Sequence, residues 1–202
     1  MNVELLSYMP SEGLHQLAKK YNIDDEDLLQ HLSFTFAVEG ISRACSHQLV
    51  RHRLASFSQK SQRYVEIKKL EKHVIIPKSI KDSMSQSFNT FIESASGLYN
   101  KLIDSGIPKE DARFILPNAT ETSILMTMDG RALLHLFGLR CCYRAQWEIK
   151  ALADEMLKKV RSVEPELFGE VGPYCLQLGY CPEGRFSCGE MKEVIEQYRS
   201  PE

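Results

Sequence analysis

The chain has 202 residues, 43% of them hydrophobic and 26% charged, with a formal net charge of -2 at pH 7. This length favours one domain with a buried core. The near-neutral charge argues against a protein that binds nucleic acid over its whole surface, and no apolar run approaches the roughly eighteen residues of a membrane span. The first residues lack the basic start and apolar core of a signal peptide, so we expect a cytoplasmic protein whose six cysteines are free thiols.

The N-terminal region predicts two strands separated by helices. Val3 to Tyr8 is short and apolar, which favours a strand. Apolar residues at three-to-four spacing predict a helix over Leu14 to Tyr21. The acids from Asp24 to Asp27 precede two leucines, as at a second helix start. Ser33 to Val38 alternates between polar and apolar residues, which predicts a half-buried strand.

The next segment predicts a helix and a loop. We expect Gly40 to end the strand and Ser42 to cap a helix from Arg43 to about Arg51. Serine and glutamine replace periodic apolar residues from Ala55 to Tyr64, so we expect a loop there.

The centre of the chain predicts two helices and a strand. Apolar residues at helical spacing indicate a long amphipathic helix over Ser79 to Ser105, ended by Gly106. Pro108 is placed in the first turn of a helix that runs to about Leu116. Asn118 to Met128 is rich in threonine and methionine and suits a strand.

The C-terminal part predicts two more helices and a tail. Asp129 can cap a helix over Arg131 to Leu139, and core spacing predicts another over Arg140 to Val163, with Trp147 as a packing residue. Residues 169–202 have the composition of a loop-rich tail. Its three cysteines are spaced more widely than the usual zinc-binding pairs, so we expect no metal site.

The basic stretch from Arg51 to Tyr64 is a candidate ligand-binding segment. It holds three arginines, a histidine and a lysine in fourteen residues without an acid. Cations at this density repel one another, which favours an anionic ligand among them. Arginine suits that ligand because its fork donates two parallel hydrogen bonds to phosphate. The composition alone also fits a solvated basic loop.

The spacing within this stretch resembles the signature of the flavin-dependent thymidylate synthases. Seven positions match at fixed offsets: Arg51, His52, Arg53, Ser56, Ser61, Arg63 and Tyr64. The resemblance extends from about Leu32 to Glu148. It implies reductive methylation of dUMP to dTMP, with FAD and NADPH supplying hydride and methylenetetrahydrofolate supplying the carbon. It also implies a homotetramer, and we expect neither nucleic acid nor membrane as a partner.

A second block of the family resembles the region from Arg113 to Glu148. Its matching positions are Arg113 before Leu116-Pro117, Asp129-Gly130-Arg131, His135, Leu139-Arg140 and Ala145-Gln146-Trp147-Glu148. Asp129 replaces the usual asparagine. Asp24 to Gln30 replaces most of a Gly-His-x-Ser-like stretch, and Gln59 stands where some members have an acid.

The resemblance assigns residues to each ligand. The residues implied for FAD are Arg51, His52, Arg53, Gln59, Asp129, Arg131 and His135. The residues implied for dUMP are Gln48, Arg51, Gln59, Lys60, Ser61, Gln62, Arg63, Arg113 and Arg140. We expect Arg140 to be catalytic, because a fixed cation beside N3 and O4 of the pyrimidine stabilises the ionised ring.

The elements and the resemblance together imply an α+β fold. We expect a single domain over residues 1–202, with a small, largely antiparallel sheet and several long helices. One alternative is a catalytically weakened family member, because of the altered 24–30 segment. The other is a nucleic-acid-binding module, because residues 43–72 hold eight lysines and arginines against two acids, with Phe57 and Tyr64 available for stacking.

Overall fold

A computed structural model describes residues 1–199, except for the side chains of Asp25 and Glu26. The chain folds into two compact units. Unit 1 contains Met1–Val38, Gln48–Phe57 and the chain from Leu125 onwards, and unit 2 contains Glu39–His47 and Ser58–Ile124. Both units therefore combine segments that are distant in the sequence.

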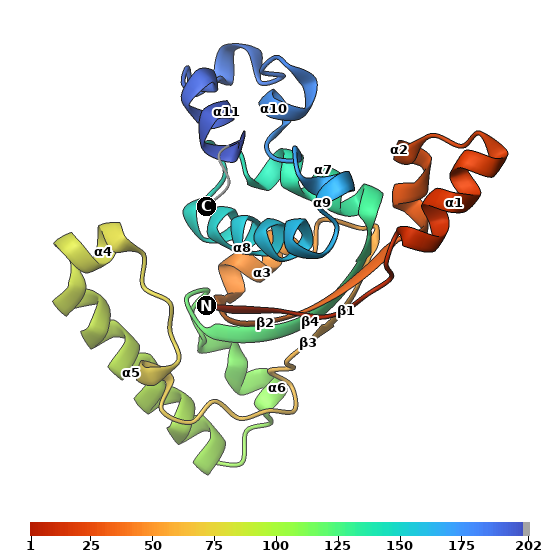
Figure 1. Ribbon diagram of the computed structural model, residues 1–202. Coiled ribbons are helices and arrows are strands. Elements are labelled where there is room, and N and C mark those ends of the chain that lie inside the picture. The colour runs from red at the N-terminus through yellow and green to blue at the C-terminus, as the bar shows by residue number, and fades with distance from the viewer. Residues whose placement is uncertain (200–202) are drawn as a thin grey trace. The chain divides into compact units, whose positions relative to one another are not determined.

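One antiparallel sheet of four strands, in the order β1-β2-β4-β3, runs through the described residues (Figure 1). Its strands are β1 (Asn2–Tyr8), β2 (Ser33–Ser42), β3 (Ala55–Gln59) and β4 (Glu121–Asp129). The three predicted strands are confirmed as β1, β2 and β4. The α+β class with a small antiparallel sheet is confirmed as well.

The helices and short 3-10 turns divide between the units. Those in unit 1 are α1 (Glu12–Tyr21), α2 (Asp25–Leu28), η1 (Leu29–His31), α7 (Gly130–Arg140), α8 (Trp147–Val163), α9 (Pro165–Phe168), α10 (Tyr174–Leu178), η4 (Gly184–Phe186) and α11 (Met191–Arg199). Those in unit 2 are η2 (Leu70–Lys72), α4 (Lys78–Ser83), α5 (Ser85–Asp104), α6 (Lys109–Ala112) and η3 (Arg113–Ile115), while α3 (Arg43–Leu49) begins in unit 2 and ends in unit 1. No helix among residues 1–199 is long and apolar enough to cross a membrane.

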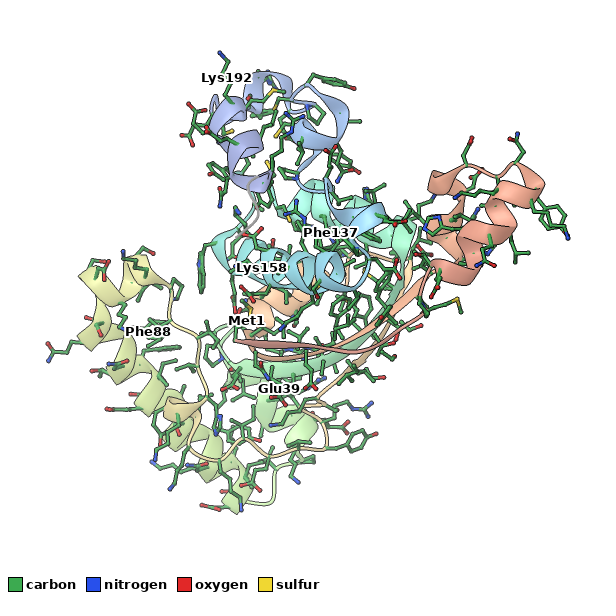
Figure 2. The ribbon with its side chains drawn as sticks, viewed as in Figure 1. Met1, Glu39, Phe88, Phe137, Lys158 and Lys192 are labelled. Atoms are coloured by element: carbon green, nitrogen blue, oxygen red, sulfur yellow. The ribbon has the colours of Figure 1, made fainter. Side chains whose placement is uncertain are left out.

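The core of unit 1 lies on one face of the sheet, under α7 and α8 (Figure 1). Phe34 and Phe36 alternate with more exposed residues on β2 and are fully buried, as the sequence predicts. The ring of Phe34 meets that of Phe168 edge to face, with ring centres 5.6 Å apart. Phe137 of α7, labelled in Figure 2, is also fully buried and packs edge to face against Phe168. Burial of these rings fixes the helices onto the sheet.

Two strand predictions are wrong in detail. Gly40 does not end β2, because it adopts a φ of 70°, which glycine tolerates, and the strand continues to Ser42. The segment predicted as a loop begins with β3, which is the edge strand beside β4. An edge strand buries few side chains, so its serines and glutamine give no apolar alternation. Its pairing depends on backbone hydrogen bonds instead.

Helix α3 starts as predicted, since the Ser42 hydroxyl accepts a hydrogen bond from the Cys45 N–H at 3.0 Å. The helix ends at Leu49, two residues before the predicted Arg51. The His52 N–H then donates to the Leu49 carbonyl at 3.1 Å. This turn places the Arg-His-Arg sequence directly after the helix.

The long helix predicted in unit 2 is interrupted. Met84 has φ -136° and ψ 23°, outside the helical region, so α4 and α5 are separate. Gly106 follows α5 with a φ of 81° and ends it as predicted. Ile92 and Tyr99 of α5 pack with Leu70 of η2 in the core of this unit. The helix predicted after Pro108 is α6 followed by the 3-10 turn η3.

The helix predicted over Arg140 to Val163 is wrong at its start. Asp129 caps α7 as predicted, accepting from the Ala132 N–H at 2.6 Å, but α7 extends to Arg140. Helix α8 begins only at Trp147, where the Gln146 side chain accepts from the Glu148 N–H at 3.0 Å. Glutamine is an uncommon cap, and residues 141–146 contain no glycine or proline, so the sequence gives no sign of the break.

Two further expectations about the C-terminal half need revision. Trp147 is 49% exposed at the first turn of α8, so the packing role predicted for it is wrong. The predicted loop-rich tail contains the helices α10 and α11, and its residues 200–202 lie outside the described residues. Helix α11 is held by the Tyr198 hydroxyl, which donates to the Cys141 carbonyl at 2.9 Å. Lys192 lies on its exposed face (Figure 2).

A matched pair of glycine variants tests the packing of α7. A Cβ atom at Gly130 would lie 2.7 Å from the Leu29 carbonyl oxygen, so Gly130→Ala should lower the free energy of unfolding by about 1–3 kcal/mol. Gly97 on α5 has open space around it, and Gly97→Ala should raise that free energy by about 0.5–1 kcal/mol. Urea unfolding measures both. A Gly130→Ala variant as stable as the parent would contradict this account.

Candidate active site

A basic cavity of about 270 Å³ lies in unit 1. Its lining consists of Arg51, His52, Arg53, Leu54, Arg131, Ala132, His135, Leu139 and Arg140. The resemblance assigns six of these residues to FAD or dUMP. Folding brings them together from the basic stretch at 51–64 and from the second block at 113–148. None of the described residues that line the cavity is acidic. The cavity therefore has the charge that an anionic ligand requires.

Two chain segments build this cavity. Arg51, His52 and Arg53 come from the turn that follows α3. Arg131, His135 and Leu139 are spaced four residues apart on α7, so they lie on one face of that helix. The helix thus presents two cationic or ionisable side chains to the Arg-His-Arg turn.

A hydrogen bond between Arg140 and His52 joins the two segments. The Arg140 Nε donates to the His52 Nε2 at 3.0 Å. His52 is only 7% exposed, and burial, followed by the nearby Arg140 charge and then His135, lowers its pKa from 6.5 to about 4. At neutral pH His52 is therefore uncharged, with its proton on Nδ1. It accepts from Arg140 and leaves the positive charge on the guanidinium.

His135 extends the network toward the C-terminal segment. Its ring lies edge to face with that of His52, with ring centres 5.9 Å apart. Its Nδ1 is hydrogen-bonded to the Tyr174 hydroxyl at 2.5 Å. Burial raises the pKa of Tyr174, so this hydroxyl keeps its proton at neutral pH. Tyr174 was missed in the sequence, where nothing distinguishes it from other tyrosines.

Two residues assigned to FAD from the resemblance lie outside this lining. Asp129 caps α7, as described above. Gln59 belongs to unit 2, where its Nε2 donates to the Thr122 hydroxyl at 3.3 Å. Arg131, which does line the cavity, also lies 3.4 Å from a carboxylate oxygen of Asp27. Both partners of this ion pair are about half exposed, so it contributes little to stability.

A second cavity, of about 310 Å³, lies in unit 2 beside the basic loop. Lys60, Ser61 and Gln62, which the resemblance assigns to dUMP, line it together. The sequence did not indicate the further polar residues of this lining: Glu66, Lys68, His73, Glu121, Thr122 and Ser123. The His73 Nδ1 lies 3.4 Å from a Glu121 carboxylate oxygen. No motif spans these residues, because β4 and the loop meet only after folding.

The remaining residues assigned to dUMP lie outside both linings. Arg63 donates to the Glu110 carboxylate through Nε at 3.0 Å and Nη2 at 2.8 Å. The Arg113 Nε donates to the Glu110 carbonyl at 3.1 Å. Burial, with a smaller contribution from Arg113, lowers the pKa of Arg43, which the sequence did not single out. Gln48 is half-buried on α3 in unit 1.

Among residues 1–199, no group of three or more histidine, cysteine or acidic side chains is arranged to hold a metal ion. All six cysteines are unbridged in this part of the chain.

The fold and the cavities define an α+β protein with an arginine-rich cavity. The family model described as thymidylate synthase complementing protein (Thy1) matches residues 12–166. The chain belongs to the flavin-dependent thymidylate synthase family.

Close relatives cover most of the chain. The flavin-dependent thymidylate synthase of Geobacter sulfurreducens is 50% identical over 185 residues, covering 91% of this chain and 79% of its own. The enzyme of the same name from Pyrococcus horikoshii is 47% identical over 200 residues, covering 95% and 82%.

Solved structures share the fold. Thymidylate Synthase X from Helicobacter pylori, solved with FAD and dUMP, has a TM-score of 0.66 and 23% identity, covering 83% of this chain and 97% of its own. A UMP/dUMP methylase, PolB, from Streptomyces cacaoi, bound with 5-Br dUMP, has a TM-score of 0.68 and 22% identity, covering 89% and 95%.

The low pKa of His52 has a measurable consequence. Between pH 6.5 and about 4, the unfolded chain binds a proton at this position and the folded protein does not. The free energy of unfolding contributed by His52 therefore falls as the pH is lowered through this window. In imidazole NMR, one histidine should titrate near pH 4, and its signal should be missing from His52→Gln.

The control for this titration is His47→Gln, which removes an exposed histidine of α3. That variant should keep the signal that titrates near pH 4. Urea unfolding at pH 7 and pH 4.5 should show a larger loss of stability for the parent protein than for His52→Gln. A His52 signal that titrates near 6.5 would disprove the assignment of a buried, neutral ring.

Proposed function

We propose that the protein converts dUMP to dTMP, taking a one-carbon group from methylenetetrahydrofolate and hydride from NADPH by way of FAD. The proposal rests on the basic cavity of unit 1, in which a neutral His52 accepts from a charged Arg140. The family membership supplies the reaction, and the cavity supplies residues whose chemistry suits it.

The residues of the basic cavity fit a flavin nucleotide. Arg51, Arg53 and Arg131 line it without an acidic neighbour in the lining, which suits the diphosphate of FAD. A cavity of about 270 Å³ is large enough for one part of such a long cofactor. When bound, the flavin supplies hydride transfer, and the protein contributes binding and orientation. Asp129 supports this site indirectly by capping the helix that carries Arg131 and His135.

Arg140 has the chemistry of the catalytic residue. A pyrimidine C5 becomes nucleophilic when negative charge builds up on the ring, and a fixed cation beside N3 and O4 stabilises that charge. The hydrogen bond from Nε to His52 orients the guanidinium. Because His52 is uncharged, it orients Arg140 without adding a second charge to be solvated.

The cavity of unit 2 suits the polar parts of dUMP. Lys60 supplies a cation, and Ser61 and Gln62 supply neutral donors and acceptors. We propose that these residues, together with Gln59, Arg63 and Arg113, bind the nucleotide, and that Gln48, Arg51 and Arg140 of unit 1 do so as well. In a homotetramer the two sets can be supplied by different subunits.

The homotetramer is part of the same proposal. Phe91 and Leu98 lie seven residues apart on α5 and are 56% and 48% exposed, and Met84, which precedes the helix, is 57% exposed. A seven-residue apolar repeat on one helix suits packing against another subunit. The unbridged cysteines suit the reducing conditions of the cytoplasm, where we place the enzyme.

The first experiment is the visible spectrum of the purified protein, followed by NADPH oxidation and dTMP formation with and without dUMP. We expect a flavin band, and oxidation that yields dTMP only when both dUMP and methylenetetrahydrofolate are present. Flavin without any response to dUMP would indicate a weakened family member. A protein that takes up no FAD, and binds single-stranded nucleic acid with a steep salt dependence, would overturn the proposal.

Arg140→Ala should separate catalysis from flavin binding. Removing the cation that stabilises the ring should lower dTMP formation by about 100-fold or more, a loss typical of one electrostatic contact in a transition state. The flavin band should persist. Arg185→Ala is the control, because this exposed arginine lies beside Phe186 and outside both cavities. Equal turnover in Arg140→Ala and the parent would refute the role of Arg140.

Arg53→Ala should instead weaken FAD binding. Arg53 is exposed at the basic cavity, and its loss removes one charge-assisted contact of about 1.5–3 kcal/mol, which is roughly a 10-fold to 100-fold weaker affinity. Flavin titration followed by fluorescence measures the change, again with Arg185→Ala beside it. Full flavin occupancy at the parent's affinity would show that Arg53 does not hold the cofactor.

A further inference from the structure

Four of the six cysteines line a third cavity, of about 200 Å³, in unit 1. These residues are Cys142, Cys175, Cys181 and Cys188. They come from the segment after α7, from α10 and from the loop before α11, so folding has gathered them. The mechanism proposed above uses none of them.

The four thiols differ in their exposure to solvent. Cys142, Cys181 and Cys188 are partly exposed, whereas Cys175 is buried. Arg140 and Arg144 line the same cavity, and the thiolate is the nucleophile in disulfide exchange. As stated above, no group of described residues has metal-binding geometry. Disulfide exchange requires an accessible thiol that reacts first and a second thiol nearby. This cavity is lined by partly exposed thiols and one buried thiol, together with arginines.

Cys142 and Cys175 both adjoin the contact between α7 and α10. Helix α10 packs against α7, and its first residue, Tyr174, lies so close to Gly138 that a Cβ atom there would be 2.6 Å from the tyrosine ring. Cys175 follows Tyr174 directly, and Cys142 follows the end of α7. Burial raises the pKa of Cys175, and electrostatic interaction with Cys142, Cys181 and Cys188 raises it further. Cys175 is therefore the slower, second nucleophile.

We propose that this cluster is a thiol–disulfide exchange site at which Cys142 and Cys175 form a reversible disulfide with the help of a low-molecular-weight disulfide. The Cys142 thiolate attacks the small disulfide, forming a mixed disulfide and releasing one thiolate. The Cys175 thiolate then attacks the Cys142 sulfur, forming the internal bond and releasing the second. Each released thiolate takes up one of the two protons, and the small disulfide is reduced to two thiols.

The site is connected to the basic cavity. Leu139 and Arg140 line both cavities, and the Tyr174 hydroxyl is bonded to His135. A bond at Cys175 constrains the neighbouring Tyr174 and so alters the surroundings of His135. We expect oxidation to shift the affinity for FAD, an effect that rests on the function proposed above.

Peptide mapping tests the exchange site without any flavin. The full chain is incubated with oxidised glutathione, free thiols are blocked with N-ethylmaleimide, and the unreduced digest is analysed by mass spectrometry. We expect one cross-linked peptide pair joining Cys142 to Cys175, lost on treatment with dithiothreitol. The proposal is overturned by the absence of this pair, by glutathione retained on Cys142 alone, or by zinc or iron that copurifies with unreactive thiols.

Two variants sharpen the test. Cys175→Ser removes only the second nucleophile, so glutathione should remain attached to Cys142. Cys45→Ala removes a buried cysteine of unit 2 and should form the same cross-link as the parent. A cross-link that forms in a protein unable to bind FAD would refute the proposed function and leave the exchange site standing. FAD binding without a cross-link would refute the exchange site and leave the proposed function standing.

Discussion

The antiparallel register between β2 and β4 is the constraint on which the rest of the structure depends. The hydroxyls of Thr35 and Thr127 lie 2.9 Å apart across the two strands, and the Arg43 N–H donates to the Thr120 carbonyl at 2.9 Å. A slip of one residue would turn every buried side chain of these strands to the opposite face. The register therefore fixes both where α3 leaves the sheet and where α7 begins.

Helix α7 positions residues of the basic cavity relative to this register. Its start is set by the Asp129 cap and by the close approach of Gly130 to Leu29. From that start, the four-residue spacing brings Arg131 and His135 to the Arg-His-Arg turn, and the last residue, Arg140, reaches His52. A buried imidazole of low pKa next to an arginine is a means of holding a cation in place without a second charge. The acids of ordinary ion pairs would neutralise the cavity that an anionic substrate needs.

The same helix also links the site to the C-terminal segment. Gly138 admits the Tyr174 ring, Tyr174 is bonded to His135, and the four thiols gather beside them. The tail is therefore more than a loop-rich extension of the fold. Its α11 is held through Tyr198 to the segment between α7 and α8, so the cysteines sit in a defined structure.

Much of the secondary structure and the family of this protein could be predicted from its sequence alone. Apolar periodicity predicted β2 and the helices α1, α5 and α8, and composition predicted β1 and β4. Ser42 and Asp129 gave the caps, and the Arg-His-Arg spacing identified the family. These features are local, so short stretches of sequence express them. Only tertiary structure decided the β3 edge strand, the break before Trp147, and the meeting of His52 with Arg140, His135 and Tyr174. Such contacts depend on backbone pairing and on residues far apart in the chain, which leave no local pattern.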